Sequence, residues 1–238
     1  MIVLSLNNPE TLADYEAVIN VDNQAWPDNT VTAAEWRHED KDWPQKYLFQ
    51  RFVAKEGRDL ILEGAVMEPF WMHVPGKYAF SYSPLPAYDE FQIDGESIHG
   101  RVYAFVVEYL AVRKPHALIS TIREDKLARI QWLLENGFRE TMREADSRLD
   151  VLNFDASPFA DVRTRVAASG VEILTLPELQ ARDSNWKVKV HELYNEIELD
   201  IIKFIETDNE ENNPMYQINL KLGYEPLPAW VDYEKKLS

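Results

Sequence analysis

Cysteine is absent from this chain of 238 residues. Its absence excludes disulfide bonds, thiolate metal sites and a cysteine nucleophile, and it is typical of a reducing compartment, so we expect a cytoplasmic protein. Long apolar runs are missing too, since no stretch approaches the ~18 residues of a transmembrane helix. The N-terminus, MIVLSLNNPETLADYE, lacks a basic region, which predicts a first strand rather than a signal peptide and no membrane partner.

Positive charge is scarce as well. The chain has 25 Lys and Arg against 41 Asp and Glu, which gives a net charge of −16. No cluster of basic residues could contact phosphates, so we expect no nucleic-acid partner, whereas a cationic ligand is electrostatically easier to bind. The alternative is that the acidic charge serves only solubility. The five histidines are scattered without the spacing of metal ligands, so no metal site is predicted.

Hydrophobic residues make up 45% of the chain, enough for a sizeable core. Their spacing predicts an α+β fold in the order β-α-α-β-β-β-α-β-α-β, after which the pattern begins again. We therefore predict two units, residues 1–155 and 156–238. The decisive predicted elements are strands at 2–6, 77–86, 116–122, 148–154, 171–176, 201–207 and 228–235, and helices at 102–112 and 177–201.

A stretch of about twenty residues occurs twice. ISTIREDKLARIQWLLENGF (119–138) aligns without a gap with IETDNEENNPMYQINLKLGY (205–224), at an offset of 205 − 119 = 86 residues. Ungapped repetition of this length predicts that one strand-helix module is present in both units. The identical pairs are Ile119/Ile205, Thr121/Thr207, Glu124/Glu210, Gln131/Gln217, Leu134/Leu220 and Gly137/Gly223.

The second copy, TDNEENNPMYQINLKLGY, resembles the N..A..LY.K.GF element of the Gcn5-related N-acetyltransferases, the GNAT family. The tandem, mycothiol-synthase-like members are the most similar. The resemblance implies a GNAT-like central mixed sheet, flanked by helices and splayed between its fourth and fifth strands, with acetyl-CoA in the gap. It implies a complete unit at 1–155 and a partial unit at 156–238 that lacks central strands and a phosphate loop.

The resemblance also implies roles for residues of the first unit. Backbone N–H groups around Ser83 and Leu85 would face the thioester carbonyl, because Pro84 between them has no N–H. A carboxylate, Glu63 or Glu68, would take the proton of the amine; strand alternation places the two on opposite faces, so at most one can face the cleft. The residues expected to contact the pyrophosphate at a helix start are His99, Gly100, Arg101 and Val102.

Several positions depart from the family pattern. The asparagine that would contact pantetheine falls on Lys126, and the tyrosine that would protonate the thiolate falls on Leu133. The second unit keeps the asparagine, as Asn212, but has Asn219 in the place of the tyrosine. Asn212 has an alternative role as a helix cap.

We therefore predict an acyl-CoA-dependent N-acetyltransferase in which a small or peptidyl amine attacks the thioester directly, with acetyl-CoA as co-substrate. The alternative is a non-catalytic relative that binds CoA weakly or not at all and acts through protein contacts. The strands of the second unit are expected to dock on the first unit or on another chain, and a homodimer stays open. Four tryptophans could wall a substrate pocket or pack in the core: Trp26, Trp36, Trp43 and Trp71.

Overall fold

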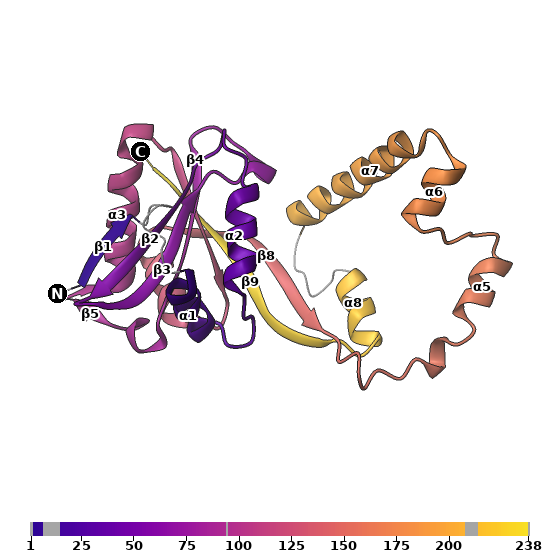
Figure 1. The fold of residues 1–238 in the computed structure, drawn as a ribbon, viewed down its shortest axis with the longest axis horizontal. Coiled ribbons are helices and arrows are strands. Elements are labelled where there is room, and N and C mark those ends of the chain that lie inside the picture. Colours follow the sequence, from indigo (N-terminus) through magenta and orange to yellow (C-terminus); the bar gives the residue numbers. More distant parts are fainter. Residues whose placement is uncertain (1, 7–14, 94, 208–213, 238) are drawn as a thin grey trace. The chain divides into compact units, whose positions relative to one another are not determined.

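The computed structural model of the chain describes residues 2–6, 15–93, 95–207 and 214–237 (Figure 1). It divides into two compact units. The first contains Met1–Glu144 together with Pro228–Ser238, and the second contains Ala145–Leu227. The C-terminal strand thus returns to the first unit, which differs from the division predicted at residue 155. The physical reason is a pairing of strands far apart in sequence, which local patterns do not reveal.

A seven-stranded mixed sheet forms the framework of the first unit. Strands β4 and β7 are parallel, whereas β1–β2, β2–β3, β3–β4 and β7–β9 are antiparallel pairs. This arrangement, flanked by helices, confirms the predicted fold class. In spatial order the strands are β1 (Ile2–Leu6), β2 (Phe49–Glu56), β3 (Asp59–Met67), β4 (Lys77–Pro84), β7 (Ala117–Arg123), β9 (Glu225–Lys236) and β8 (Arg139–Arg148).

Helices cover the sheet because alternate strand residues are apolar on both faces. On one face, α1 (Tyr15–Ala25) buries Val18, Ile19 and Val21, and α2 (Ala33–Asp42) begins with a capping box between Thr32 and Glu35. On the other face lie α3 (Ile98–Leu110) and α4 (Leu127–Glu135). Aromatic contacts of α3 with the strands include Phe52–Phe105 and Tyr82–His99, and Phe138, just after α4, contacts Phe80.

Strands β4 and β7 separate at the middle of the sheet. They pair only from Lys77–Ala79 to Ala117–Ile119, although both strands continue beyond these residues. The splay between the fourth and fifth strands of the main sheet, expected from the resemblance, is therefore present. It frees the edges of two central strands near the cavity described below.

Apart from the end of β8 and the beginning of β9, the described elements of the second unit are helices, which corrects three predicted strands. Residues 201–207 belong to a long helix, and residues 171–175 and 149–154 form neither strand nor helix. A short apolar run fits a strand or a helix equally well, and at 201–207 the preceding helix propagates through it. The unit contains α5 (Val162–Ala168), α6 (Leu176–Arg182), α7 (Trp186–Thr207) and α8 (Pro214–Lys221).

Short elements complete the chain. The β5–β6 pair precedes α3, and single turns of 3-10 helix follow several strands. Among the helices in the described ranges, none combines the length and apolarity needed to cross a bilayer. These short elements are β5 (Gln92–Ile93), β6 (Glu96–Ser97), η1 (Phe70–Met72), η2 (Pro86–Tyr88), η3 (Ala111–Arg113) and η4 (Ser157–Phe159).

Candidate functional site

A cavity of about 410 Å³ lies on the sheet face that α1 and α2 cover. Aromatic side chains form much of its wall, and Trp26, Trp36 and Trp43 are among them, as the sequence allowed. Trp71 does not line it and is 61% exposed. The size suits a small molecule. The charged and hydroxyl residues of the lining are Asp22, Glu39, Asp40, Arg51, Glu63, Ser81, Tyr82, Ser83, Thr121 and Arg129.

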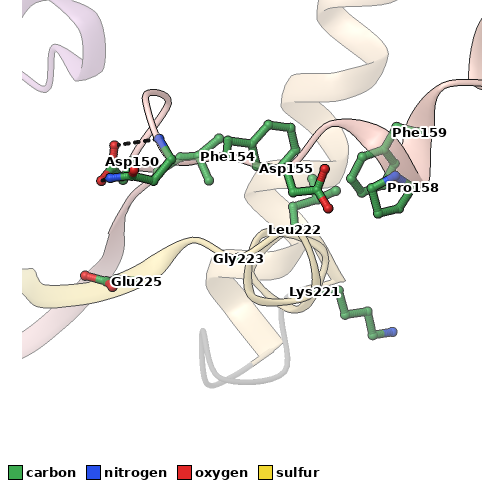
Figure 2. Close-up of a pocket in the computed structure, with 11 residues that line it drawn as sticks. Asp150, Phe154, Asp155, Pro158, Phe159, Lys221, Leu222, Gly223 and Glu225 are labelled. Carbon is green, nitrogen blue, oxygen red and sulfur yellow. Dashed lines mark hydrogen bonds between the residues drawn. The ribbon is translucent and has the colours of Figure 1, made fainter.

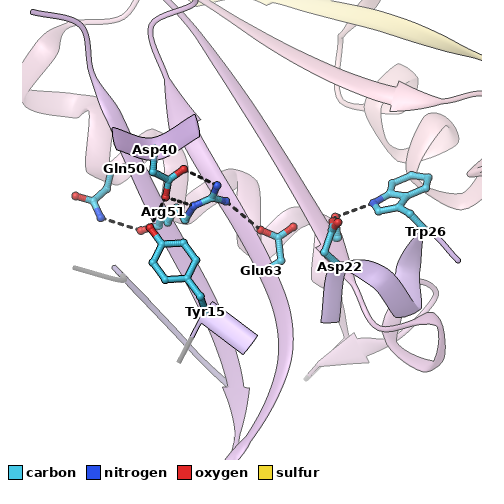
Figure 3. A network of polar contacts seen from close by, with 8 residues as sticks. Tyr15, Asp22, Trp26, Asp40, Gln50, Arg51 and Glu63 are labelled. Carbon is cyan, nitrogen blue, oxygen red and sulfur yellow. Dashed lines mark hydrogen bonds and ion pairs between the residues drawn. The ribbon is translucent and has the colours of Figure 1, made fainter. Parts of the chain in front are cut away.

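A buried carboxyl pair stands at one part of this cavity (Figure 3). Glu63, on β3, is 4% exposed, and burial followed by the nearby charge of Asp22 raises its pKa to about 8. Burial also raises the pKa of Asp22, on α1. Ser83 Oγ donates to Asp22 Oδ1 at 2.8 Å and accepts from Trp26 Nε1 at 2.9 Å. The pair can therefore hold or accept a proton near neutral pH.

Arg51 lies on the other side of Glu63 but is already neutralised. Its Nε and Nη2 donate to the two carboxylate oxygens of Asp40 at 2.8 and 2.7 Å. Tyr15 adds a third donor to Asp40 at 2.8 Å, and the guanidinium lies 3.9 Å from the Trp36 ring centroid. Arg51 Nη1 is 3.8 Å from Glu63 Oε2. Glu63 therefore has only a partial counter-charge, which lowers its pKa by less than burial and Asp22 raise it.

The structure separates the two predicted bases. Glu63 lines the cavity, whereas Glu68 does not. Glu68 Oε2 instead accepts the Leu48 backbone N–H at 2.8 Å, and the Glu68 N–H donates to the Leu48 carbonyl at 2.9 Å. Glu68 thus ties the beginning of β2 to the end of β3, and of the two predicted bases only Glu63 lines the cavity.

The amides predicted to face a thioester are committed to the sheet. The Leu85 N–H donates to the Ile61 carbonyl at 2.8 Å. Hydrogen-bonded pairs alternate along an antiparallel ladder, so the Ser83–Glu63 pair, two residues away, is of the same type. The Ser83 side chain faces the cavity, but its N–H points toward β3. The N–H groups of these two residues thus pair with β3, and an oxyanion donor there stays a prediction.

The beginning of α3 is likewise occupied by the protein itself. Ser97 caps the helix, and its Oγ accepts the Gly100 N–H at 3.1 Å. The Ile98 N–H donates to the Phe91 carbonyl at 3.1 Å. A side chain built on Gly100 would meet the Glu96 carboxylate at 3.2 Å, and Arg101 Nε lies 3.7 Å from that carboxylate. The Glu96 carboxylate would repel a pyrophosphate at this place, and the N–H groups that are already hydrogen-bonded could not donate to it.

His99 and Val102, the other two residues predicted there, are buried. His99 Nδ1 lies 3.0 Å from the Tyr82 hydroxyl. Burial, followed by the charge of Arg129, lowers the pKa of His99 to about 4. His99 contacts Tyr82 of β4, and Val102 belongs to the hydrophobic core. Pyrophosphate contacts at these residues stay a prediction.

Sequence reasoning missed Arg129, a residue of α4 that is 2% exposed. Its Nη1 donates to the Tyr82 carbonyl at 2.7 Å and its Nη2 donates to Ser120 Oγ at 2.9 Å. Its Cζ lies 3.6 Å from the centroid of the Tyr82 ring. Tyr82 belongs to β4 and Ser120 to β7, so Arg129 bridges the two strands where they have separated.

A sequence signal existed for two of the missed residues. Asp22 lies one helical turn after Val18 and Ile19, on the apolar stripe of its helix. Arg129 lies one turn before Leu133, which is fully buried. A charged side chain on the buried face of an amphipathic helix needs a partner, and this was the available indication.

Asn219, one of the two family positions of the second unit, is not among the residues that line the cavity. Asn212 lies outside the described residues, and Asn219 Nδ2 lies 3.4 Å from Ser147 Oγ. The second unit has its own hollow of about 410 Å³ (Figure 2), with carboxylates at Asp150 and Asp155. Both accept the backbone N–H groups of their own turns. In the described part of the chain, no group of His, Asp or Glu is placed to hold a metal ion.

The fold and the cavity together define a mixed-sheet protein with a small-molecule site of mixed charge beside a parted pair of central strands. No protein-family model and no curated protein matches the sequence. Solved structures match the fold in part, each covering about three fifths of this chain. The identities and TM-scores given next are too low to assign a family.

Three of these structures are acetyltransferases by description. A candidate phosphinothricin N-acetyltransferase has 14% identity and a TM-score of 0.49, covering 63% of this chain and 90% of its own. A candidate acetyltransferase from Salmonella typhimurium, with its cofactor acetyl-CoA, has 16% identity and a TM-score of 0.45, covering 63% and 86%. A ribosomal-protein-alanine N-acetyltransferase from Brucella melitensis has 18% identity and a TM-score of 0.44, covering 60% and 88%.

Proposed function

We propose that this protein transfers an acyl group from acetyl-CoA to an amine bound in the cavity of the first unit. The observation that carries the proposal is a buried carboxyl, Glu63, whose pKa is raised to about 8, beside the parting of β4 and β7. A general base works best when its pKa is near the working pH. The aromatic walls and the acidic surroundings of Glu63 suit an alkylammonium group.

The roles of the residues follow from their contacts. The ammonium would bind near Asp22 and Glu63, and deprotonated Glu63 would take its proton so that the nitrogen can attack. Ser83 holds Asp22 in place, and Trp26 holds Ser83. The nitrogen forms a C–N bond with the thioester carbon of the acyl donor, the C–S bond breaks, and CoA leaves as a thiolate that takes a proton from solvent. We place no phosphate contact at the beginning of α3, since Ser97 and Glu96 already occupy it.

The deciding experiment compares Glu63→Gln with Glu68→Gln in an acetyl-transfer assay over a panel of amines. Removal of a general base costs about 10²–10⁴-fold in rate. We expect this loss for Glu63→Gln and near-normal activity for Glu68→Gln, because Glu68 does not line the cavity. The wild-type rate should rise with pH through about 8. Equal activity of Glu63→Gln and the wild type would contradict the assignment.

The second candidate function is a binding protein that takes an amine in the same cavity without acyl transfer. The observation that favours it is the beginning of α3, where amides that could bind phosphates are occupied by Ser97 and by the Phe91 carbonyl. Calorimetry with acetyl-CoA and with desulfo-CoA separates the two. Binding of amines without binding of either CoA compound would favour the second candidate.

A further inference from the structure

Arg129 is a buried cation on which the carboxyls of Asp89 and Glu63 act only from a distance, without a direct ion pair. Its two hydrogen bonds go to a carbonyl and to a hydroxyl, both of which are neutral. Its Nε is buried and has no hydrogen-bond partner. Within the described residues, no carboxylate lies within salt-bridge distance of the guanidinium. Burying a charge in this way is costly unless something pairs with it.

The same guanidinium lines the cavity of the first unit. Arg51, the other buried arginine of that cavity, differs in having Asp40 as a bidentate partner. A carboxylate or similar anion is the chemistry that a planar guanidinium recognises. The missing counter-charge of Arg129 is therefore expected from a ligand.

The cavity carries the opposite charge elsewhere. Asp22 and Glu63 lie together at the side covered by α1, and Arg129 reaches the cavity from α4, through the parting of β4 and β7. The Arg51–Asp40 pair is internally neutral and does not cancel either charge. One cavity thus contains an acidic pair from α1 and β3 and, from α4, a cation that forms no ion pair with them.

We propose that the cavity binds a compound that carries both an ammonium group and a carboxylate, the amino-acid class of ligand. The ammonium lies against Asp22 and Glu63, and the carboxylate pairs with Arg129. The inference names the chemical class of the acyl acceptor, and its relevance to catalysis rests on the proposed function. The binding itself requires no acyl transfer.

The test is calorimetry on the full chain without acetyl-CoA. The probes are ω-amino acids from glycine to 6-aminohexanoate, each compared with the alkylamine and the carboxylic acid of the same chain length. We expect at least one amino acid to bind on the order of tenfold more tightly than both of its single-charge analogues. If no amino acid does so, the proposal is wrong, whatever any variant shows.

Two variants test whether Arg129 binds the carboxylate of the ligand. Arg129→Met should bring the affinity of the best amino acid down to that of its alkylamine, while alkylamine binding is unchanged. Arg143→Met is the matched control, because Arg143 is paired with Glu140 and lies outside the cavity. A preference for the amino acid that survives in folded Arg129→Met would overturn the assignment of this residue.

The outcomes also separate this inference from the proposed function. Amino-acid binding that depends on Arg129, without any acetyl transfer, would support this inference and contradict the proposed enzymatic function. Acetyl transfer to plain alkylamines, without a preference for amino acids, would do the reverse. A third arm with acetyl-CoA alone asks whether Arg129→Met weakens donor binding; if only the donor is affected, the anion belongs to the donor and the proposal fails.

Discussion

At the residue scale, burial decides which of the two similar carboxylates could carry chemistry. Glu63 and Glu68 lie on the same strand or its end, five residues apart, and the sequence favours neither. Glu63 is buried beside Asp22, whereas Glu68 accepts a backbone N–H from Leu48. The first environment raises a pKa, while the second anchors a strand. The same logic distinguishes Arg129, which lacks an anion, from Arg51, which has Asp40.

The raised pKa of Glu63 makes folding stability depend on pH. Its pKa is about 8 in the folded protein, against an ordinary value of 4.5, so the folded state keeps a proton that the unfolded state releases. The free energy of unfolding should therefore fall as pH rises from about 4.5 to about 8, by at most about 1.4 kcal/mol per pH unit from this group. Glu63→Gln should remove this part of the slope.

The measurement is urea unfolding of the wild type, Glu63→Gln and Glu68→Gln at several pH values between 5 and 9. Differences between variants cancel the contribution of other groups, such as His99, whose lowered pKa acts in the opposite direction. We expect Glu63→Gln to gain stability relative to the wild type toward pH 8 and Glu68→Gln to follow the wild-type slope. Parallel curves for all three proteins would show that Glu63 titrates normally.

At the scale of elements, the repeated stretch is preserved only at its helix end. Helices α4 and α8 both finish in a glycine with positive φ, +87° at Gly137 and +86° at Gly223. The next aromatic N–H returns to the helix in both, from Phe138 to Leu133 and from Tyr224 to Asn219, each at 3.0 Å. The first copy begins with β7, whereas residues 201–207 of the second copy are helical. The common ancestry of the two copies stays a prediction.

The glycines at these two helix ends should contribute differently to the stability of the folded protein. An alanine is strained at positive φ, which costs about 1 kcal/mol or more. After Gly137 comes Phe138, which is fully buried in the core of the first unit, whereas Tyr224 is partly exposed. We expect Gly137→Ala to lower the melting temperature of the sheet unit and Gly223→Ala to leave it nearly unchanged. Scanning calorimetry of both variants checks this, and equal losses would contradict it.

At the scale of the whole molecule, the two units differ in how they bury apolar residues. The first has an extensive core, whereas no residue is buried within 145–196 and 216–227, the parts of the second unit whose side chains the structure describes. Leu152 is 97% exposed and Ile173 is 74% exposed. Helices with exposed apolar side chains gain little stability by themselves. We predict that these exposed apolar side chains are covered by the first unit or by another chain, for example in a homodimer.

A fragment containing residues 156–238 should therefore not fold by itself. It would lack a core, and its strand β9 would lose the partner β7, with which it pairs from Ala117–Lys236 to Arg123–Trp230. We expect a fragment without a cooperative thermal transition, and partial recovery of structure when residues 1–155 are added. Circular dichroism melting of the fragment with and without its complement is the measurement. Cooperative melting of the fragment alone would contradict the expectation.

The sequence by itself determined the local features. Apolar spacing predicted β1, β4, β7 and α3, and the repeated stretch predicted the strand-helix module formed by β7 and α4. These follow from short-range rules of periodicity and capping, which one stretch of chain contains completely. The absence of cysteine and the acidic balance also needed no structure for their interpretation.

Only the tertiary structure decided the composition of the site. Asp22, Glu63 and Ser83 come from three elements, and Arg129 reaches the same cavity from a fourth. The return of β9 to β7 and the capture of the α3 amides by Ser97 were equally a matter of packing. The pKa of a carboxyl and the cost of an unpaired guanidinium depend on burial and on neighbours distant in sequence. Such neighbours exist only once the chain has folded.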